Sequence, residues 1–117
     1  LGHACEMIEE SDVGMVIHFK RVPVFMEAFE YVRMGLIPGG SYRNEGFRKS
    51  FVRAGQDINN DVMKILFDPQ TSGGLLIALA GHQAETFIEK LHFRGVTDAA
   101  IIGEIISENP GKILVME

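Results

Sequence analysis

Residues 67–78 constrain the fold more than any other stretch, because they combine a helix stop, two adjacent glycines and an apolar run. Pro69 fixes its own φ and disfavours helical backbone at Asp68, so any preceding helix must end here. The Gly73-Gly74 pair permits positive φ and close approach of another backbone or a ligand. Residues 75–80 are continuously apolar, which predicts a strand covered on both faces.

The rest of the chain predicts helices alternating with strands. We expect helices over 1–10, 23–35, 61–67 and 84–95, and strands over 13–19, 75–80, 99–106 and 113–116. Pro23 suits the first residue of a helix, Gly35 a helix C-cap, and Asn59 or Asn60 an N-cap. Pro38-Gly39-Gly40 predicts a loop, and residues 45–56 fit either a short irregular helix or a loop. The order implies one mixed sheet with packed helices.

The turn signals near the C-terminal end are the clearest. Glu108-Asn109-Pro110-Gly111 predicts a hairpin or tight turn joining the last two strands.

Composition and charge exclude two classes of partner. A chain of 117 residues is expected to form one domain. Its net charge is -5 and its Lys and Arg residues form no stripe, which argues against nucleic acid as a binding partner. No apolar run approaches the roughly 20 residues that span a bilayer, which argues against a membrane. Cys5, the one cysteine, cannot form an intramolecular disulfide, and this fits a reducing, cytoplasmic setting.

The sequence also carries a family resemblance. Residues 68–77, Asp-Pro-Gln-Thr-Ser-Gly-Gly-Leu-Leu-Ile, resemble the C-terminal hallmark of the selenophosphate synthetase (selenide, water dikinase) family, which is related to aminoimidazole ribonucleotide synthetase. Residues 37–44 and 102–105 fit the same family. The opening Leu1-Gly2-His3 is similar to the end of that family's Asp-x-Thr-Gly-Phe-Gly-Leu-Leu-Gly-His motif. The resemblance therefore spans the whole chain.

The resemblance implies a fold and a domain organisation. The fold would be an α/β (α+β) sandwich with a single mixed sheet, similar to the C-terminal domain of aminoimidazole ribonucleotide synthetase and partly ferredoxin-like. Residues 1–117 would be one domain, the C-terminal part of a two-domain enzyme whose N-terminal ATP-binding domain is absent here.

It also implies a reaction, in which ATP, selenide and water give selenophosphate, AMP and phosphate, and selenophosphate serves as selenium donor for selenoproteins and seleno-tRNA. ATP, Mg²⁺ and K⁺ would be bound mainly by the absent domain. The complete enzyme would be a homodimer in the cytoplasm, and we expect no catalytic residue in this chain. Two alternatives remain: a thiamine-monophosphate kinase-like, hydrogenase-maturation or aminoimidazole ribonucleotide synthetase relative, or a non-catalytic oligomerisation module.

Two glycine segments are the candidate binding elements. A Gly-rich turn with hydroxyls can present backbone N–H groups to an anion, and Arg and Asn side chains add donors. The family reading places both segments on the face towards the ATP domain. The candidates are Gly39, Gly40, Arg43, Asn44, Gln70, Thr71, Ser72, Gly73 and Gly74. The alternatives are a tight turn into the strand, and a surface loop whose Arg43 pairs with Glu45.

Three further residues invite a chemical role. Asp68 is the candidate metal ligand, with a turn-forming role as its alternative. Cys5 is expected to be structural, since it lies on the inward side of a short helix. His3 does not pair with it as a metal ligand, because residues two apart do not face each other on a helix.

Overall fold

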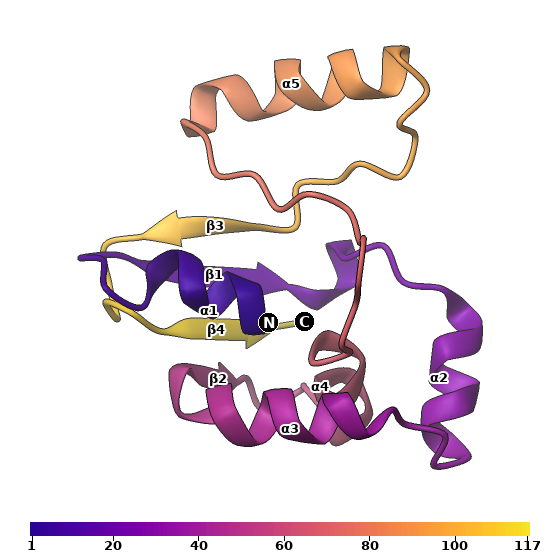
Figure 1. The fold of residues 1–117 in the computed structure, drawn as a ribbon. Helices are drawn as coiled ribbons and strands as arrows, with labels where there is room; N and C mark the ends of the chain where they lie inside the picture. The colour runs from indigo at the N-terminus through magenta and orange to yellow at the C-terminus, as the bar shows by residue number, and fades with distance from the viewer.

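The computed structural model describes residues 1–117 and contains one four-stranded mixed sheet in the order β2-β4-β1-β3 (Figure 1). The strands are β1 (Gly14–His18), β2 (Val52–Ala54), β3 (Gly103–Ile106) and β4 (Ile113–Met116). β4 runs parallel to both β1 and β2, whereas β3 is antiparallel to β1. The predicted fold class, a single mixed sheet with helices, is confirmed.

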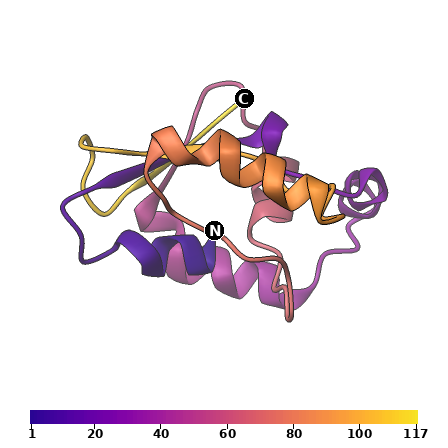
Figure 2. The ribbon, with the colours of Figure 1, turned by 90° about the horizontal axis from the view of Figure 1, so that it is seen from above.

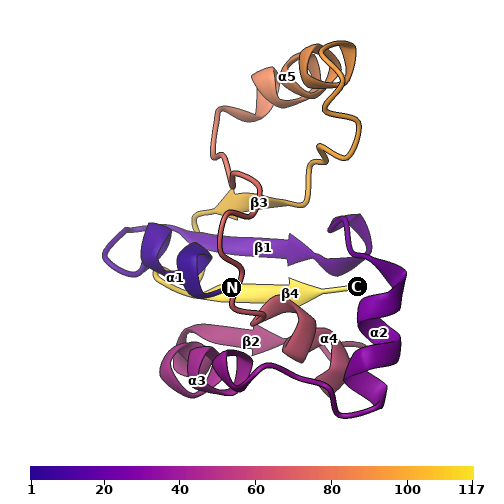
Figure 3. The ribbon, with the colours of Figure 1, turned by 45° about the vertical axis from the view of Figure 1, so that its right-hand side comes forward.

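Five α-helices accompany the sheet: α1 (Gly2–Ile8), α2 (Met26–Arg33), α3 (Gly39–Arg48), α4 (Asn60–Leu66) and α5 (Gly81–Phe93). Two 3₁₀ turns cover Phe19–Arg21 and Lys49–Phe51. Seen from above, α1 and α3 lie on the same side of the strands (Figure 2). α2 packs against α4, and α5 lies beyond β3 at the end of two extended connections (Figure 3). None of the helices combines the length and apolar character that crossing a membrane requires.

The core lies between α1 and the central strands. Side chains two apart on a strand point to the same face, so β1 and β4 present matching apolar pairs in register, Met15 opposite Ile113 and Ile17 opposite Val115. α1 covers them with its inward face. The buried cluster comprises Ala4, Cys5, Ile8, Met15, Ile17, Ile113 and Val115.

Several helix ends follow the sequence prediction. Gly35 has a φ of +76°, and the Leu36 N–H donates to the Tyr31 carbonyl at 2.9 Å, which is the Schellman arrangement that glycine favours. Gly95 closes α5 with a φ of +86°. Asn59 caps α4, its Oδ1 accepting from the Val62 N–H at 3.0 Å. The N-terminal prediction for α2 is wrong, because the helix begins at Met26 and not at Pro23.

The predicted strand over 75–80 is wrong. Residues 71–79 make no backbone–backbone hydrogen bond, and the Leu75 side chain is 89% exposed. These residues instead form an extended connection from α4 to α5 (Figure 3). An apolar run favours a strand only where a neighbouring strand supplies hydrogen bonds, and here none is paired with it.

The predicted loop at Pro38-Gly39-Gly40 is also wrong, because α3 begins at Gly39 with Pro38 as its N-cap residue. Proline suits a helix start, since the amide that it lacks would have no intrahelical partner there. The ambiguous stretch 45–56 contains the end of α3, a 3₁₀ turn and β2, and that strand was not foreseen.

The last two strands do not form a hairpin. β1 lies between β3 and β4, so the connection crosses the start of β1, and β3 begins at Gly103 rather than at 99. The tight turn itself is confirmed: Asn109 and Gly111 have φ values of +52° and +67°. The Gly111 N–H donates to the Val13 carbonyl at 2.9 Å, which holds the turn against the residue that precedes β1.

Candidate functional site

The two glycine segments meet in space. A Cβ built on Gly40, in the first turn of α3, would lie 2.6 Å from Cγ and 2.8 Å from Cβ of Pro69. The absence of a side chain at Gly40 therefore lets the turn after α4 lie against α3. This turn comprises residues 68–74 and is called the 68–74 turn. The structure brings together the segments that the sequence singled out separately.

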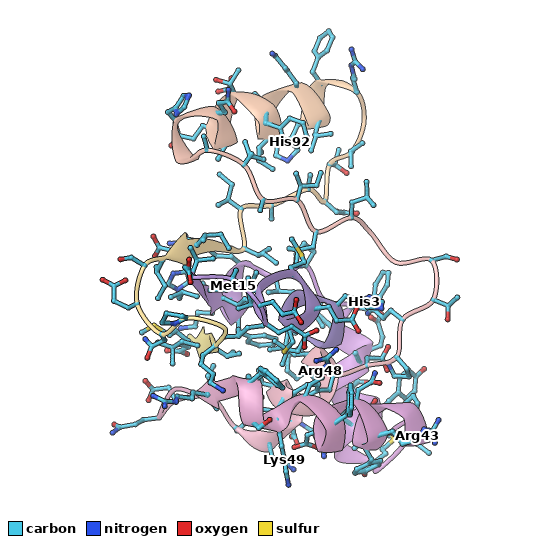
Figure 4. The ribbon with its side chains drawn as sticks, turned by 60° about the vertical axis from the view of Figure 1, so that its left-hand side comes forward. His3, Met15, Arg43, Arg48, Lys49 and His92 are labelled. Carbon is cyan, nitrogen blue, oxygen red and sulfur yellow. The ribbon has the colours of Figure 1, made fainter.

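Free donors lie at the start of α3. Of the first three backbone amides of α3, those of Gly39 and Gly40 have no hydrogen-bond partner. The third, the Ser41 N–H, donates to the Pro38 carbonyl at 2.9 Å. Arg43 folds back towards this end: its Nη1 lies 3.5 Å from the position of a Cβ on Gly39. Figure 4 shows Arg43 at the N-terminal end of α3.

The suggested pair between Arg43 and Glu45 is not formed. Glu45 pairs with the buried Lys64 of α4, whose Nζ also lies 4.3 Å from the centroid of the Tyr42 ring. Arg43 makes no ion pair with any carboxylate. Its guanidinium is therefore a free cation at the positive end of a helix.

Asn44 has a structural contact. Its Nδ2 donates to the carbonyl of Phe67 at 3.1 Å, which fastens α3 to the end of α4. Phe67 is almost fully buried, and its carbonyl lies beyond the last residue of that helix. Asn44 therefore positions the 68–74 turn next to α3 through one of the two hydrogens of its Nδ2.

The 68–74 turn exposes its polar groups. The Gln70 N–H donates to the Asp68 carbonyl at 2.9 Å, and the residues from Thr71 to Gly74 are exposed. Ser72 adopts the positive φ, +58°, whereas neither Gly73 nor Gly74 does so. The glycine pair therefore provides open backbone rather than a left-handed turn.

Asp68 takes part in the turn through its backbone. Its N–H donates to the Ile65 carbonyl at 3.1 Å, and its carboxylate makes no hydrogen bond or ion pair. No group of three or more His, Cys, Asp or Glu side chains gathers around it or elsewhere. Asp68 alone does not form a metal site, although Mg²⁺ is often held by one or two carboxylates together with phosphate oxygens.

A large open hollow borders both segments. It measures about 1760 Å³ and lies between α5, the connection over 75–79, the sheet and α1. The apolar face of α5 lines it with Phe87, Ile88 and Leu91, and its wall reaches Ser41 and the 68–74 turn. Of the candidate residues, the hollow is lined by Asn44, Gln70, Thr71, Gly73 and Gly74, whereas Gly39, Gly40, Arg43 and Ser72 lie outside its lining.

Sequence reasoning missed Ser41. Its side chain is fully buried, and its Oγ has no hydrogen-bond partner. A buried hydroxyl without a partner is uncommon, since it forfeits the hydrogen bonds it made with water. The available signal was the sequence Gly39-Gly40-Ser41, which was assigned to a loop and not to the first turn of a helix.

Arg48 also proved to be a structural residue. Its side chain is largely buried between an acid of α1 and the acid that caps the helix: Nη2 lies 3.1 Å from Oε1 of Glu6, and Nη1 bonds Glu9. The guanidinium also lies 4.6 Å from the Phe47 ring centroid and 5.7 Å from that of Phe51. Arg48 joins α3 to α1, whereas Lys49 points away from that contact (Figure 4).

Cys5 is buried, as predicted. It is fully inaccessible within the core, and this burial raises the pKa of its thiol although the Leu1 ammonium and Arg48 oppose the shift. A thiol held neutral in this way is a poor nucleophile and a poor metal ligand.

Comparisons of the sequence with known proteins identify its family. A family model described as "AIR synthase related protein, C-terminal domain" matches residues 1–115. The chain is similar to "Selenide, water dikinase" of Pelobacter propionicus, with 45% identity over 98% of this chain and 33% of the relative. It is also similar to "Selenide, water dikinase 2" of Peptoclostridium acidaminophilum, with 40% identity over 99% of this chain and 33% of the relative. The corresponding protein of Porphyromonas gingivalis is 41% identical over 98% of this chain and 33% of its own length. The chain thus spans about a third of the length of the curated relatives it matches.

Proposed function

Because the chain belongs to the family of AIR synthase related C-terminal domains, we propose that it acts as the C-terminal third of a selenide, water dikinase. The complete enzyme would convert ATP, selenide and water into selenophosphate, AMP and phosphate. The relatives reported above all carry that name, which favours the selenium enzyme over a thiamine-monophosphate kinase-like, hydrogenase-maturation or aminoimidazole ribonucleotide synthetase relative.

The contact between Gly40 and Pro69 is the observation on which the proposed role of this domain in binding phosphate depends. It makes one continuous surface of the first turn of α3 and the 68–74 turn, with exposed amides, hydroxyls and a free guanidinium. Transfer of a phosphoryl group depends mainly on positioning and on neutralising charge. These groups would bind phosphate oxygens and form one wall of the cleft that an N-terminal ATP-binding domain closes.

Other components belong to the complete enzyme. Mg²⁺ would neutralise the phosphates, with Asp68 as the one ligand that this chain offers, and K⁺ would bind elsewhere. The N-terminal domain, a homodimeric assembly and a cytoplasmic setting stay predictions. Because the nucleophile, most metal ligands and most nucleotide contacts would come from the N-terminal domain, the 117 residues alone should not form AMP from ATP in response to selenide.

A domain replacement tests the proposal. The matching third of the Pelobacter propionicus enzyme is exchanged for residues 1–117, and AMP formation from ATP is measured with and without selenide. We expect the hybrid to form AMP in a selenide-dependent reaction at a rate within about tenfold of the parent enzyme. A tenfold loss of rate corresponds to about 1.4 kcal/mol in the activation free energy. The parent and a chain lacking this third serve as controls. A folded hybrid without selenide-dependent AMP formation would contradict the proposal.

A further inference from the structure

The 68–74 turn is held against one face of α3 at two points. Gly40 and Asn44 are four residues apart in α3, so they lie on the same side of the helix. The Asn44 Nδ2 donates to the Phe67 carbonyl at 3.1 Å. Gly40 lies against the Pro69 ring, whose Cγ would be 2.6 Å from a Cβ at that position. Both contacts fall at the base of the turn, where the chain leaves α4, so α3 determines where the turn begins.

The rest of the turn has no such attachment. Residues 71–74 make no hydrogen bond with any other part of the chain, through backbone or side chain. The Gln70 side chain lies across the turn, with its Oε1 3.1 Å from the position of a Cβ on Gly73. The turn is thus folded on itself, and a shift at its base moves its exposed backbone and hydroxyl groups as well.

The hydrogen bond from Asn44 is the more specific of the two contacts. No other donor in the chain reaches the Phe67 carbonyl, which follows the last residue of α4. The Phe67 side chain is almost fully buried and stays in place through its own packing. Removing the Asn44 amide therefore releases the base of the turn from α3 without removing a side chain from the core.

α3 is itself a firm support for the turn. Arg48, at its C-terminal end, lies 3.1 Å from Glu6 of α1, and Glu45 pairs with the buried Lys64 of α4. These ion pairs attach α3 to two other helices. A turn fastened to this helix is therefore placed relative to the whole domain.

We propose that Asn44 is a positioning residue for the phosphoryl transfer and that it acts through the 68–74 turn, with Gly40 as the second point of attachment. This role rests on the proposed function and deepens it, because it assigns two candidate binding residues to placing the turn rather than to contacting the ligand. Donors stabilise the charge of a transition state only when they are placed in advance. A misplacement of about 1 Å can cost on the order of a hundredfold in rate.

Turnover of the domain-replacement hybrid tests this role against a matched control. Asn44→Ala should lower kcat for selenide-dependent AMP formation by about tenfold to a hundredfold. The KM for ATP should stay nearly unchanged, because the nucleotide would be held mainly by the N-terminal domain. The control is Asn59→Ala, which also removes one hydrogen bond between an asparagine side chain and the backbone, at the opposite end of α4. Both variants should lose similar stability, but Asn59→Ala should keep the kcat of the unaltered hybrid.

Amide chemical shifts of the ¹⁵N-labelled 117-residue chain give a second readout, which does not require activity. Asn44→Ala should move the signals of residues 70–74, whereas Asn59→Ala should leave them in place. Unmoved signals from residues 70–74 in Asn44→Ala, or equal kcat values for the two variants, would overturn the proposal while the proposed function stands. An unaltered hybrid that forms no AMP in response to selenide would instead refute the proposed function, and the role of Asn44 would fall with it.

Discussion

Gly40 lies directly against the ring of Pro69, so that a Cβ at position 40 would stand 2.6 Å from the Pro69 Cγ. This contact joins the N-terminal end of α3 to the turn that follows α4. The atoms that meet position 40 belong to a ring and not to the far end of a flexible side chain, so rotation about a side-chain bond cannot relieve the contact.

The contact predicts opposite effects of the same substitution at adjacent glycines. Gly40→Ala should lower the free energy of unfolding by about 1–3 kcal/mol, the usual range for overpacking. Gly39→Ala, whose added Cβ would meet only Arg43 Nη1 at 3.5 Å, should be neutral or stabilising by up to about 1 kcal/mol, because alanine is a better helix former. Urea denaturation of both variants measures the difference. Equal effects would show that Pro69 does not restrict position 40.

Ser41 should limit stability. Replacing it with alanine removes a buried hydroxyl that has no partner, and we expect the free energy of unfolding to rise by about 1 kcal/mol. Ser41→Val would instead add volume to a fully buried position and should destabilise. Thermal melts of the three proteins check this order. A destabilised Ser41→Ala variant would mean that the hydroxyl already has a partner in solution.

Asn44 should matter for stability more than for binding. Asn44→Ala removes the donor to the Phe67 carbonyl and should cost about 1 kcal/mol. Asn44→Asp keeps the shape but places an acceptor against an acceptor, so its cost should be larger at neutral pH and should shrink as the new carboxyl is protonated near pH 4. Denaturation at pH 7 and pH 4 distinguishes the two variants. Identical costs at both pH values would argue against this hydrogen bond.

The exposed donors should show the reverse behaviour. In a complete enzyme containing this domain, Arg43→Ala and Thr71→Val should lower turnover by about 2–4 kcal/mol in transition-state terms if they contact phosphate during the reaction. Their melting temperatures should hardly change, because both side chains are exposed and unpaired. Arg53→Ala serves as the matched control. Normal turnover in both variants would exclude these residues from the reaction.

Cys5 should make stability depend on alkaline pH. Burial raises the pKa of its thiol in the folded state, so the unfolded chain ionises first as the pH rises. This contribution is fully present below about pH 8 and is lost as the pH passes the unfolded value near 8.5–9 towards the folded pKa. Cys5→Ala should cost about 1 kcal/mol at pH 7 for the lost buried volume, and the difference from the unaltered chain should shrink above pH 9. Denaturation curves from pH 7 to pH 10 test this, and a constant difference would contradict it.

Local signals predicted the helices better than the strands. The N-cap at Asn59, one of two residues predicted for it, the C-cap at Gly35 and the helix end near Gly95 depend on neighbouring residues, and the structure confirms them. The strand at 75–80 and the hairpin after Ile106 depended on pairing partners that an apolar run does not specify. β2 was missed because it is three residues long and contains Arg53 among half-buried and exposed positions.

The candidate site shows the same limit. The sequence identified both glycine segments, but the contact of Gly40 with Pro69 depends on how α3 packs against α4, which no local pattern contains. The roles of Asn44 and Arg48 likewise depend on partners distant along the chain, Phe67 in one case and Glu6 with Glu9 in the other. Which polar residues of a motif are unpaired donors and which hold two elements together therefore depends on the packing, and the sequence alone does not show it.

The strand order also has a consequence for synthesis on the ribosome. β4 is the last element along these 117 residues, yet it lies between β1 and β2 and contributes the fully buried Ile113 and Val115. Until it emerges, β2 has no neighbouring strand and the inward face of α1 has only half of its apolar partners. A nascent chain that ends before residue 113 should therefore remain open to chaperones and proteases, and the domain should fold in one late step rather than element by element during translation.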